Sequence, residues 1–219
     1  VKVDNATLIS DENHYSVWYK PYGMLSQGSK WSDHCTIARF AQQYLIPERP
    51  VFIVHRLDRA ATGLILIAHS KKAARALSSM FENRTADDND LEKYYQIIVH
   101  GDHSQRPQPD IITDNIEDKK ARSTFSLSDY NSQQDLSLIN VKIDTGRKHQ
   151  IRQHAASIQL PIVGDRLHGD TRKSYPNALN LQLCAVSLNF ICPLSGQPQA
   201  FHVPSPLRPT LANVIKLLT

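Results

Sequence analysis

Three polar segments interrupt hydrophobic stretches of the sequence and hold the side chains that could do chemistry. They are residues 55–63, residues 93–95 followed by Val99 and Gly101, and residues 144–152 with their continuation at 161–165. The first contains Asp58, whose carboxylate could act as a covalent nucleophile. Burial alone would raise the pKa of such a carboxyl group, and a nearby cation would oppose that effect.

Residues in these segments also have ordinary structural explanations. An aspartate between two strands, such as Asp58, usually serves as a turn or capping residue. A tyrosine on a strand, such as Tyr95, usually packs across the sheet. An arginine on a helix, such as Arg152, is usually a solvated charge or part of an ion pair. Taken singly, these residues leave both interpretations open.

The third segment concentrates positive charge. Between Thr145 and Gly169 the only acidic residue is Asp165, whereas the whole chain has 25 Lys and Arg against 21 Asp and Glu and a net charge of +4. Such a local patch suits a phosphate backbone, and the alternative is a basic helix face in plain solvent. The basic residues and histidines of the patch are Arg147, Lys148, His149, Arg152, His154, Arg166 and His168.

Several familiar catalytic motifs are missing from the sequence. It has no G-x-x-x-x-G-K-[ST] loop, no G-x-G-x-x-G, no H-E-x-x-H and no G-x-S-x-G. His149 and His154 are five residues apart, so they would face different sides of a helix. A nucleotide-hydrolysing, dinucleotide-dependent or zinc mechanism therefore has no support in the sequence, and we expect no metal site.

Apolar runs place the first segment between two strands. Residues 51–54 and 64–68 are predicted to be buried strands, so residues 55–62 form the loop between them. Further strands are predicted at residues 16–19, 94–99, 122–127, 136–143 and near 181–190. Residues 84–90 are polar and acidic, which predicts a mobile connection.

Helices are predicted at four places. Ile37, Phe40, Ala41 and Tyr44 mark one helical face, with Thr36 or Asp33 as a possible cap. A second helix follows Ser70, with Ala73, Leu77 and Phe81 on one face. A third runs from Lys148 to about Ile158 and ends before Pro161. The last covers residues 206–218, with Pro206 able to open it.

The predicted strands outnumber the helices and do not alternate with them. This order favours an α+β fold, with a mixed, mainly antiparallel central sheet and flanking helices. No internal repeat or low-complexity linker is evident, so a single catalytic domain over residues 1–219 is the simplest interpretation. We expect a monomer.

Composition indicates a globular chain that works without a membrane. Hydrophobic residues make up 41% and charged residues 21% of the 219 positions. No apolar run approaches the roughly 20 residues of a membrane span, and residues 1–5 lack the features of a signal peptide. The three cysteines form no C-x-x-C pair. We therefore expect a reducing, cytoplasmic location.

Four motifs, taken together, resemble those of RluA-type pseudouridine synthases. Residues 55–64 resemble the family signature H-R-L-D-x-x-T-S-G-L, and Lys93-x-Tyr95 with Val99-x-Gly101 resembles the second motif. Residues 146–152 resemble G-R-T-H-Q-I-R, with 161–165 as its continuation, and residues 20–23 match the early N-K-P-x-G. The motifs occur in family order and span most of the chain.

The sequence departs from the family pattern at a few positions. Ala61-Thr62 stands where many members have Thr-Ser, and Lys148 replaces the usual Thr. Cys184 replaces a His, which puts one neighbouring contact in doubt. No S4-type RNA-binding domain is evident. None of these departures removes a residue on which the family's chemistry depends.

The resemblance implies an isomerase that converts uridine in RNA to pseudouridine without a cofactor or metal. By motif position, Asp58 is the catalytic nucleophile, acting on the uracil ring or at C1′ of the ribose. Arg152 resembles the arginine that pairs with this aspartate, and Tyr95 the tyrosine that stacks under the target base.

The same resemblance implies residues that bind the RNA. Arg56 resembles the residue that some members insert into the space left by the extruded base, an extrusion that costs a few kcal/mol. Ile151 would line the apolar side of the pocket. The remaining predicted RNA-binding residues are His55, Arg147, Lys148 and His149.

Two other functions remain open at this point. One is a non-catalytic RNA-binding or RNA-folding module on the same fold, and the other is a base-releasing glycosidase, which also needs a carboxylate. The RNA partner is tRNA or rRNA. The short chain and the region around residues 20–25 resemble the tRNA-modifying TruC-like branch, which favours tRNA slightly.

Overall fold

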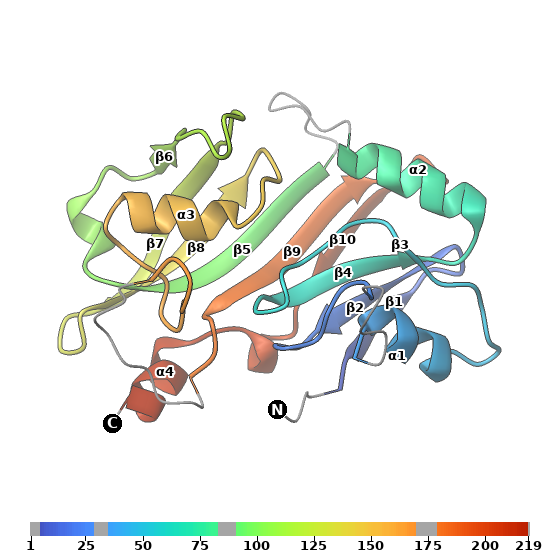
Figure 1. The fold of residues 1–219 in the computed structure, drawn as a ribbon, viewed down its shortest axis with the longest axis horizontal. Helices are drawn as coiled ribbons and strands as arrows, with labels where there is room; N and C mark the ends of the chain where they lie inside the picture. The colour runs from blue at the N-terminus through green and yellow to red at the C-terminus, as the bar shows by residue number, and fades with distance from the viewer. Residues whose placement is uncertain (1–4, 29–34, 83–90, 170–178, 219) are drawn as a thin grey trace. The chain divides into compact units, whose positions relative to one another are not determined.

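Two units make up the chain in the computed structural model, which describes residues 5–28, 35–82, 91–169 and 179–218 (Figure 1). Unit 1 comprises Val1–Arg84, Asp88–Leu91 and Ser187–Val203. Unit 2 comprises Thr85–Asp87, Glu92–Val186 and Pro204–Thr219.

The strands of unit 1 are joined by antiparallel pairing, in part through the buried strand β4. β4 (Thr62–Ala68) pairs with β2 (Tyr15–Lys20) and with the short β3 (Phe52–Ile53), and β2 pairs with β1 (Thr7–Asp11). All of β4 except Thr62 is buried, as its continuous apolar run predicts. β10 (Pro198–His202) pairs with the part of β9 (Leu183–Ile191) that begins at Ser187.

Two capped helices complete unit 1. α1 (Ile37–Tyr44) begins at Thr36, whose hydroxyl accepts a hydrogen bond from the Arg39 N–H. Its aromatic residues pack edge-on against Trp18 of β2, with a centroid distance of 5.3 Å to Tyr44. α2 (Lys71–Glu82) follows Ser70, whose hydroxyl accepts from the Ala73 N–H at 3.1 Å.

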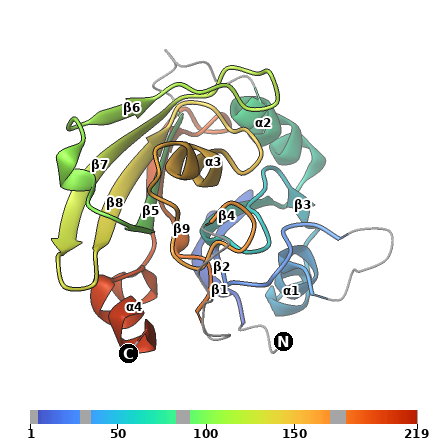
Figure 2. The ribbon, with the colours of Figure 1, turned by 60° about the vertical axis from the view of Figure 1, so that its left-hand side comes forward.

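Unit 2 is built on four antiparallel strands in the order β5-β8-β7-β6. Their bounds are Leu91–His100 for β5, Asp110–Ile112 for β6, Ser123–Asn131 for β7 and Leu136–Ile143 for β8. α3 (Gln150–Ser157) packs on β7, and α4 (Leu211–Leu218) packs on β8 (Figure 2). Buried residues of α4, β5 and β8 share a core cluster with Val163 and Leu179.

Short three-ten turns lie at His103–Gln105 and Ser205–Leu207. The second turn corrects the prediction for the last helix, which begins at Leu211 and not at Pro206. Arg208 precedes Pro209 and is extended, with φ −83° and ψ 150°, because a residue before proline avoids the helical region. Thr210 then caps the helix through a hydrogen bond from the Asn213 N–H.

The α+β class with a mainly antiparallel sheet and flanking helices is confirmed. The predicted strand over residues 51–54 is wrong in extent, since only Phe52–Ile53 pairs with β4. The connection predicted at residues 84–90 lies outside the described residues. The single-domain organisation stays a prediction. In the described part of the chain, no helix has the combined length and apolar character that spanning a bilayer requires.

Candidate functional site

Asp58 lies in the loop of residues 54–61, between β3 and β4 of unit 1. The Ala61 N–H donates to the Asp58 carbonyl at 3.1 Å, which closes a tight turn directly after the carboxylate. The residue is half-buried, whereas its neighbour Arg56 is exposed. The loop therefore presents Arg56 to solvent and leaves Asp58 partly accessible.

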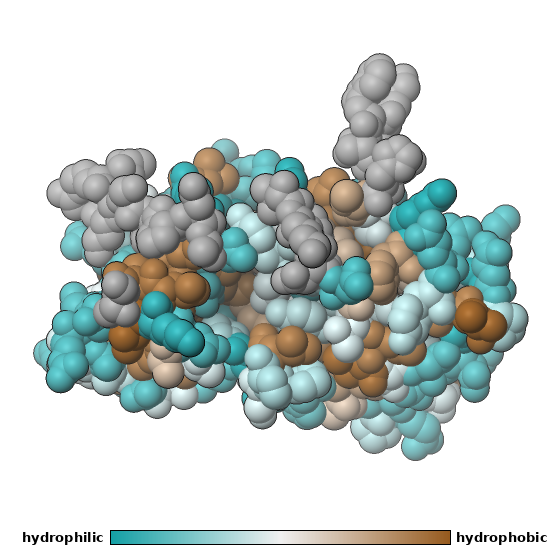
Figure 3. Space-filling model, turned by 90° about the horizontal axis from the view of Figure 1, so that it is seen from below, coloured by the Kyte–Doolittle hydropathy of each residue, from teal (hydrophilic) through white to brown (hydrophobic). Residues whose placement is uncertain are grey.

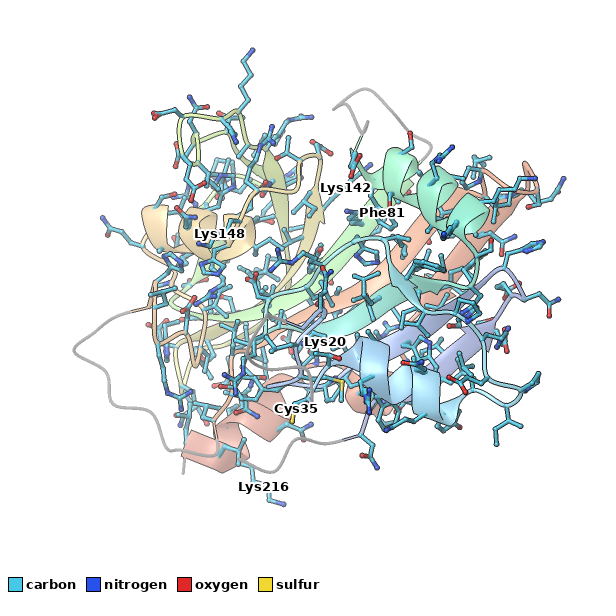
Figure 4. The ribbon with its side chains drawn as sticks, turned by 45° about the vertical axis from the view of Figure 1, so that its right-hand side comes forward. Lys20, Cys35, Phe81, Lys142, Lys148 and Lys216 are labelled. Carbon is cyan, nitrogen blue, oxygen red and sulfur yellow. The ribbon has the colours of Figure 1, made fainter. Side chains whose placement is uncertain are left out.

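His55 fixes the start of this loop. Its Nε2 accepts a hydrogen bond from the Leu66 N–H of β4 at 3.0 Å. Its ring also stacks on Phe81 of α2, with centroids 4.1 Å apart (Figure 4 labels Phe81). Because Nε2 accepts, the neutral ring carries its proton on Nδ1. The structure thus gives His55 a positioning role, and its contact with RNA stays a prediction.

Leu57 and Ser26 hold the middle of the loop through a reciprocal pair of hydrogen bonds. The Ser26 hydroxyl donates to the Leu57 carbonyl at 2.7 Å, and the Leu57 N–H donates to the same hydroxyl at 3.0 Å. Both residues are buried. The residue immediately before Asp58 is therefore fixed on both its backbone groups.

Lys20 ties a second loop to the Asp58 loop. Its ammonium group donates to the carbonyls of Ala61 at 2.6 Å, Met24 at 2.9 Å and Pro21 at 3.1 Å (Figure 4). The side chain is fully buried. Burial lowers the pKa of Lys20 to about 7, and the negative charge of Asp58 opposes that shift.

The Lys20 loop also contacts Arg59 through its glycine. The Gly23 N–H donates to the Arg59 carbonyl at 2.9 Å, and Arg59 Nε donates back to the Gly23 carbonyl at 3.1 Å. Gly23 has a φ of 82°, which favours glycine. The Lys-Pro-x-Gly motif was the sequence signal for this support, although the sequence alone did not assign Lys20 a role.

Tyr95 lies on β5 of unit 2, opposite Val141 of β8. It is half-buried, and Ile97 and Val99 on the same face of the strand are fully buried. Its neighbour Tyr94 points to the other face, where the ammonium of Lys142 lies 5.8 Å from the ring centroid. Because successive side chains of β5 point to opposite faces of the sheet, Tyr95 lies on the face opposite to Tyr94 and Lys142.

The predicted basic residues lie at the start of α3. Arg147 and Lys148 are exposed, and His149 is half-buried with a φ of 54° (Figure 4 labels Lys148). This left-handed backbone corrects the predicted start of the helix, because Lys148 and His149 precede it. Arg147 Nε also donates to the Lys120 carbonyl at 3.0 Å.

Gln150 anchors this basic turn from inside the protein. Its Oε1 accepts from the Thr145 hydroxyl at 2.7 Å and from the Arg147 N–H at 3.1 Å. Its Nε2 donates to the Arg122 carbonyl and to the Ser123 hydroxyl, both at 2.9 Å. Gln150 was not predicted from the sequence, since only the fold shows that this amide is buried.

His154, one helical turn after Gln150, extends the same network. Its Nδ1 lies 2.9 Å from the Ser123 hydroxyl and its Nε2 lies 3.0 Å from the Asp114 carbonyl. Burial lowers the pKa of His154 below its usual value. The ring is therefore a buried positioning group and not part of the solvent-facing basic patch.

Arg152 forms a buried, bidentate ion pair with Asp165. Nε donates to Oδ2 at 2.8 Å and Nη2 donates to Oδ1 at 2.6 Å, and the two side chains are 7% and 1% exposed. Burial by itself raises the pKa of Asp165. The hydrogen bonds from Arg152 and from two backbone N–H groups lower it by more than burial raises it, so the pKa lies below its usual value. The expected pairing of Arg152 with Asp58 stays a prediction.

Within each unit the structure brings part of the predicted set together. In unit 1 one anchored loop carries His55, Arg56 and Asp58. In unit 2 one turn and helix carry Arg147, Lys148, His149, Ile151 and Arg152, with Ile151 and Arg152 buried. Among the residues that the structure describes, no group of three or more His, Cys, Asp or Glu side chains is arranged to hold a metal ion.

Comparison with known proteins identifies the family. Residues 14–157 match the model of the RNA pseudouridylate synthase family. The chain belongs to this family. The resemblance to RluA-type synthases that the four motifs predicted is thereby confirmed.

Curated relatives of this pseudouridine synthase domain include tRNA pseudouridine synthase C of three bacteria. The protein from Yersinia pestis is 31% identical over 87% of this chain and 82% of its own length. The protein from Vibrio cholerae is 32% identical over 82% of each chain. The protein from Pectobacterium carotovorum is 34% identical over 68% of this chain, which spans only 45% of that relative's length.

Solved structures support the fold. Human RNA Pseudouridylate Synthase Domain Containing 1 is 18% identical and superposes with a TM-score of 0.73 over 98% of this chain and 94% of its own. Human RNA Pseudouridylate Synthase Domain Containing 4, also 18% identical, superposes with a TM-score of 0.67 over 90% of this chain and 88% of its own. At this identity the likeness is one of fold alone.

Proposed function

We propose that this chain isomerises uridine to pseudouridine in RNA, with Asp58 as the catalytic nucleophile. The observation that carries the proposal is the position of Asp58: a partly accessible carboxylate in a loop whose flanking residues are fixed by Ser26 and Lys20. A rigid loop with one reactive group suits catalysis by a pre-positioned nucleophile. The family match supplies the reaction.

The reaction needs no atoms from outside the substrate. The C1′–N1 glycosidic bond breaks, the uracil turns, and a C1′–C5 bond forms. The proton on C5 is then lost, and N1 gains one. Asp58 attacks either the uracil ring or C1′ of the ribose, and both routes regenerate the carboxylate.

Other residues have proposed roles by motif position. Tyr95 stacks under the target uracil, and Arg152 pairs with Asp58. Arg56 occupies the space that the flipped base leaves. His55, Ile151 and the basic residues Arg147, Lys148 and His149 complete the proposed RNA-binding set.

The proposed substrate is tRNA, ahead of rRNA. The relatives named tRNA pseudouridine synthase C support this choice. We propose that the protein acts as a monomer in the cytoplasm. Neither a metal nor a cofactor has a part in the proposed reaction.

Release of tritium from RNA labelled at C5 of uridine tests the activity. We expect purified protein to release tritium from tRNA transcribed with labelled uridine, because C5 loses its proton when the new bond forms. The product should be pseudouridine, and free uracil would indicate a glycosidase instead. If no tRNA or rRNA preparation released tritium, the proposed function would be wrong.

Replacing the carboxylate tests the nucleophile. Asp58→Asn should lower the rate of tritium release by about a thousandfold or more, because a neutral amide is a poor nucleophile. RNA binding should persist, which separates catalysis from a binding module. The control is Asp129→Asn, which makes the same substitution at an exposed residue of β7. The asparagine can still accept the hydrogen bond from the Tyr130 N–H, so the rate should not change. Wild-type turnover in Asp58→Asn would contradict the assignment.

A further inference from the structure

A tightly held turn of residues 165–169 follows the segment that runs along β5 in unit 2. The Val163 N–H donates to the Ile98 carbonyl at 2.8 Å, and Ile162 bridges Val99. This pairing places Asp165 next to the guanidinium of Arg152, with which it forms a hydrogen bond. Asp165 is only 3% exposed. The position of the turn is thus set by the sheet at its start and by a buried ion pair at its first residue.

Asp165 also organises the turn itself. Its Oδ1 accepts from the Leu167 N–H at 2.9 Å and from the His168 N–H at 3.0 Å, in addition to Arg152. A Cβ at Gly169 would overlap the Asp165 carbonyl oxygen, so the turn closes only around glycine. The backbone of Leu167 therefore has one defined position.

The turn presents an apolar side chain in a basic surface. Leu167 is 63% exposed, and the neighbouring Arg166 is also exposed. His168 Nε2 lies 2.9 Å from His149 Nδ1, which joins the turn to the Arg147–Lys148 stretch before α3. The other exposed large hydrophobic residues in the described part of the chain are Tyr44, Ile46, Ile111, Ile191 and Leu217. On the face that Figure 3 shows, brown hydrophobic residues lie among teal hydrophilic ones.

An exposed leucine by itself needs no special explanation. Leu167 differs from a leucine such as Leu217 of α4, 44% exposed, in two respects. Its own backbone N–H is pinned by a buried carboxylate, and cationic or titratable side chains precede and follow it. A fixed apolar group flanked by an arginine and a histidine matches the two parts of a nucleotide, a base face and a phosphate.

We propose that Leu167 packs against an unstacked RNA base beside the target uridine, with Arg166 and the His149–His168 pair facing the adjacent phosphates. This proposal rests on the proposed function, since it places the contact on the same RNA. Proteins that open nucleic-acid stacks commonly insert or apply apolar side chains to the exposed base. Because the backbone of Leu167 is already ordered, little conformational entropy is lost on contact.

The turn also connects this contact to Arg152. One carboxylate, Asp165, holds Leu167 through its backbone and Arg152 through its side chain. A base that packs on Leu167 is therefore held in a fixed position relative to Arg152, the arginine proposed to pair with Asp58. Leu167 is a contact residue for the substrate and takes no part in bond breaking.

Truncating the leucine tests the contact. Leu167→Ala should raise KM for substrate tRNA by about five- to tenfold with kcat within twofold, since one base contact is lost. Leu167→Met should restore most of the affinity, because methionine keeps an apolar surface of similar volume. The matched control Leu217→Ala removes another exposed leucine of unit 2 and should leave KM unchanged. Urea unfolding of each variant shows whether the fold is intact.

A crosslink gives a second readout that does not depend on turnover. A photoreactive diazirine analogue of leucine at position 167 should crosslink to tRNA, and the same analogue at position 217 should not. An unchanged KM for Leu167→Ala together with no crosslink at position 167 would overturn the inference. Failure of the wild-type protein to release tritium would instead overturn the proposed function, so the two failures are distinguishable.

Discussion

At the scale of single residues, Lys20 shows how a buried amine supports the loop of a reactive carboxylate. Its side-chain nitrogen lies within hydrogen-bonding distance of four carbonyls, at 2.6, 2.9, 3.1 and 3.5 Å, in its own loop and in the Asp58 loop. Without this side chain, each of these buried carbonyls would lose a hydrogen-bond donor. Lys20 therefore supports the loop that carries Asp58 without being part of the proposed reaction.

Because Lys20 is buried, the free energy of unfolding should depend on pH in a specific way. Its pKa falls from the ordinary 10.5 to about 7 in the fold. Between about pH 7 and pH 10 the unfolded chain binds a proton at this residue and the folded chain does not, so this residue makes stability rise with pH across that window. We expect Lys20→Met to remove this rise and to lower the free energy of unfolding by about 1–3 kcal/mol at pH 7, because carbonyls lose their donor.

Urea unfolding of the wild-type protein and of Lys20→Met at several pH values between 7 and 10 measures both effects. Lys216→Met is the control, since Lys216 of α4 is exposed (Figure 4). The control should keep the wild-type stability and its dependence on pH. The same pH dependence in wild type and Lys20→Met would mean that Lys20 is not the group responsible.

Individual site residues differ in how far the sequence could predict them. Asp58, Tyr95 and Arg152 were predicted from their motif positions. The supporting roles of Gln150 and Asp165 were not predicted, because a polar residue is recognised as buried and hydrogen-bonded only once the packing around it is known. The motif indicates the reacting group, whereas tertiary structure identifies what holds it.

At the scale of elements, the basic turn before α3 depends on one amide. Gln150 accepts from Thr145 and Arg147 and donates to Arg122 and Ser123. These four hydrogen bonds join the turn, the helix and the start of β7. The exposed side chains of Arg147 and Lys148 therefore extend from a backbone turn that the buried Gln150 amide holds in place.

Removing this amide should loosen the turn. We expect Gln150→Ala to lower the free energy of unfolding by about 2–3 kcal/mol, because buried groups lose their partners. Amide hydrogen exchange at Arg147 should also become faster, since its N–H loses its acceptor. Gln153→Ala is the matched control: its amide donates to the Lys148 carbonyl at an exposed site, 2.9 Å away, and should contribute less than about 0.5 kcal/mol.

Exchange measured by mass spectrometry over residues 144–150 checks this prediction. Unchanged protection at Arg147 in Gln150→Ala would show that the turn is held by something other than this side chain. Equal losses of stability in Gln150→Ala and Gln153→Ala would contradict the importance of burial.

Elements with a clear apolar period were predicted well, and the others were not. α1 and α2 begin after the predicted caps Thr36 and Ser70, because each combines a cap with one apolar face. β1, β6 and β10 were not predicted: they are short and partly exposed, so they show little alternation. Such strands are stabilised by pairing with a neighbour, which no local pattern reveals.

At the scale of the whole molecule, charge is distributed unevenly although it nearly cancels. The net charge is +4, from 25 basic and 21 acidic side chains. Long-range attraction of RNA by the total charge is therefore weak. Binding should depend on local groups, above all on the exposed Arg147 and Lys148 at the start of α3.

This distribution predicts how RNA affinity depends on salt. Each phosphate contact contributes about 0.7–0.9 to the slope of log K against log salt, because bound counterions are released. The double variant Arg147→Gln/Lys148→Gln should reduce that slope by roughly 1.4–1.8 and weaken binding alike for different RNA sequences. Lys71→Gln/Lys72→Gln removes two exposed charges from α2 and should change the slope less. Filter binding between 50 and 200 mM salt, with the Asp58→Asn substitution present in every protein, measures the slopes without turnover. Equal reductions of the slope in both double variants would mean that RNA is attracted by overall charge and not by the turn before α3.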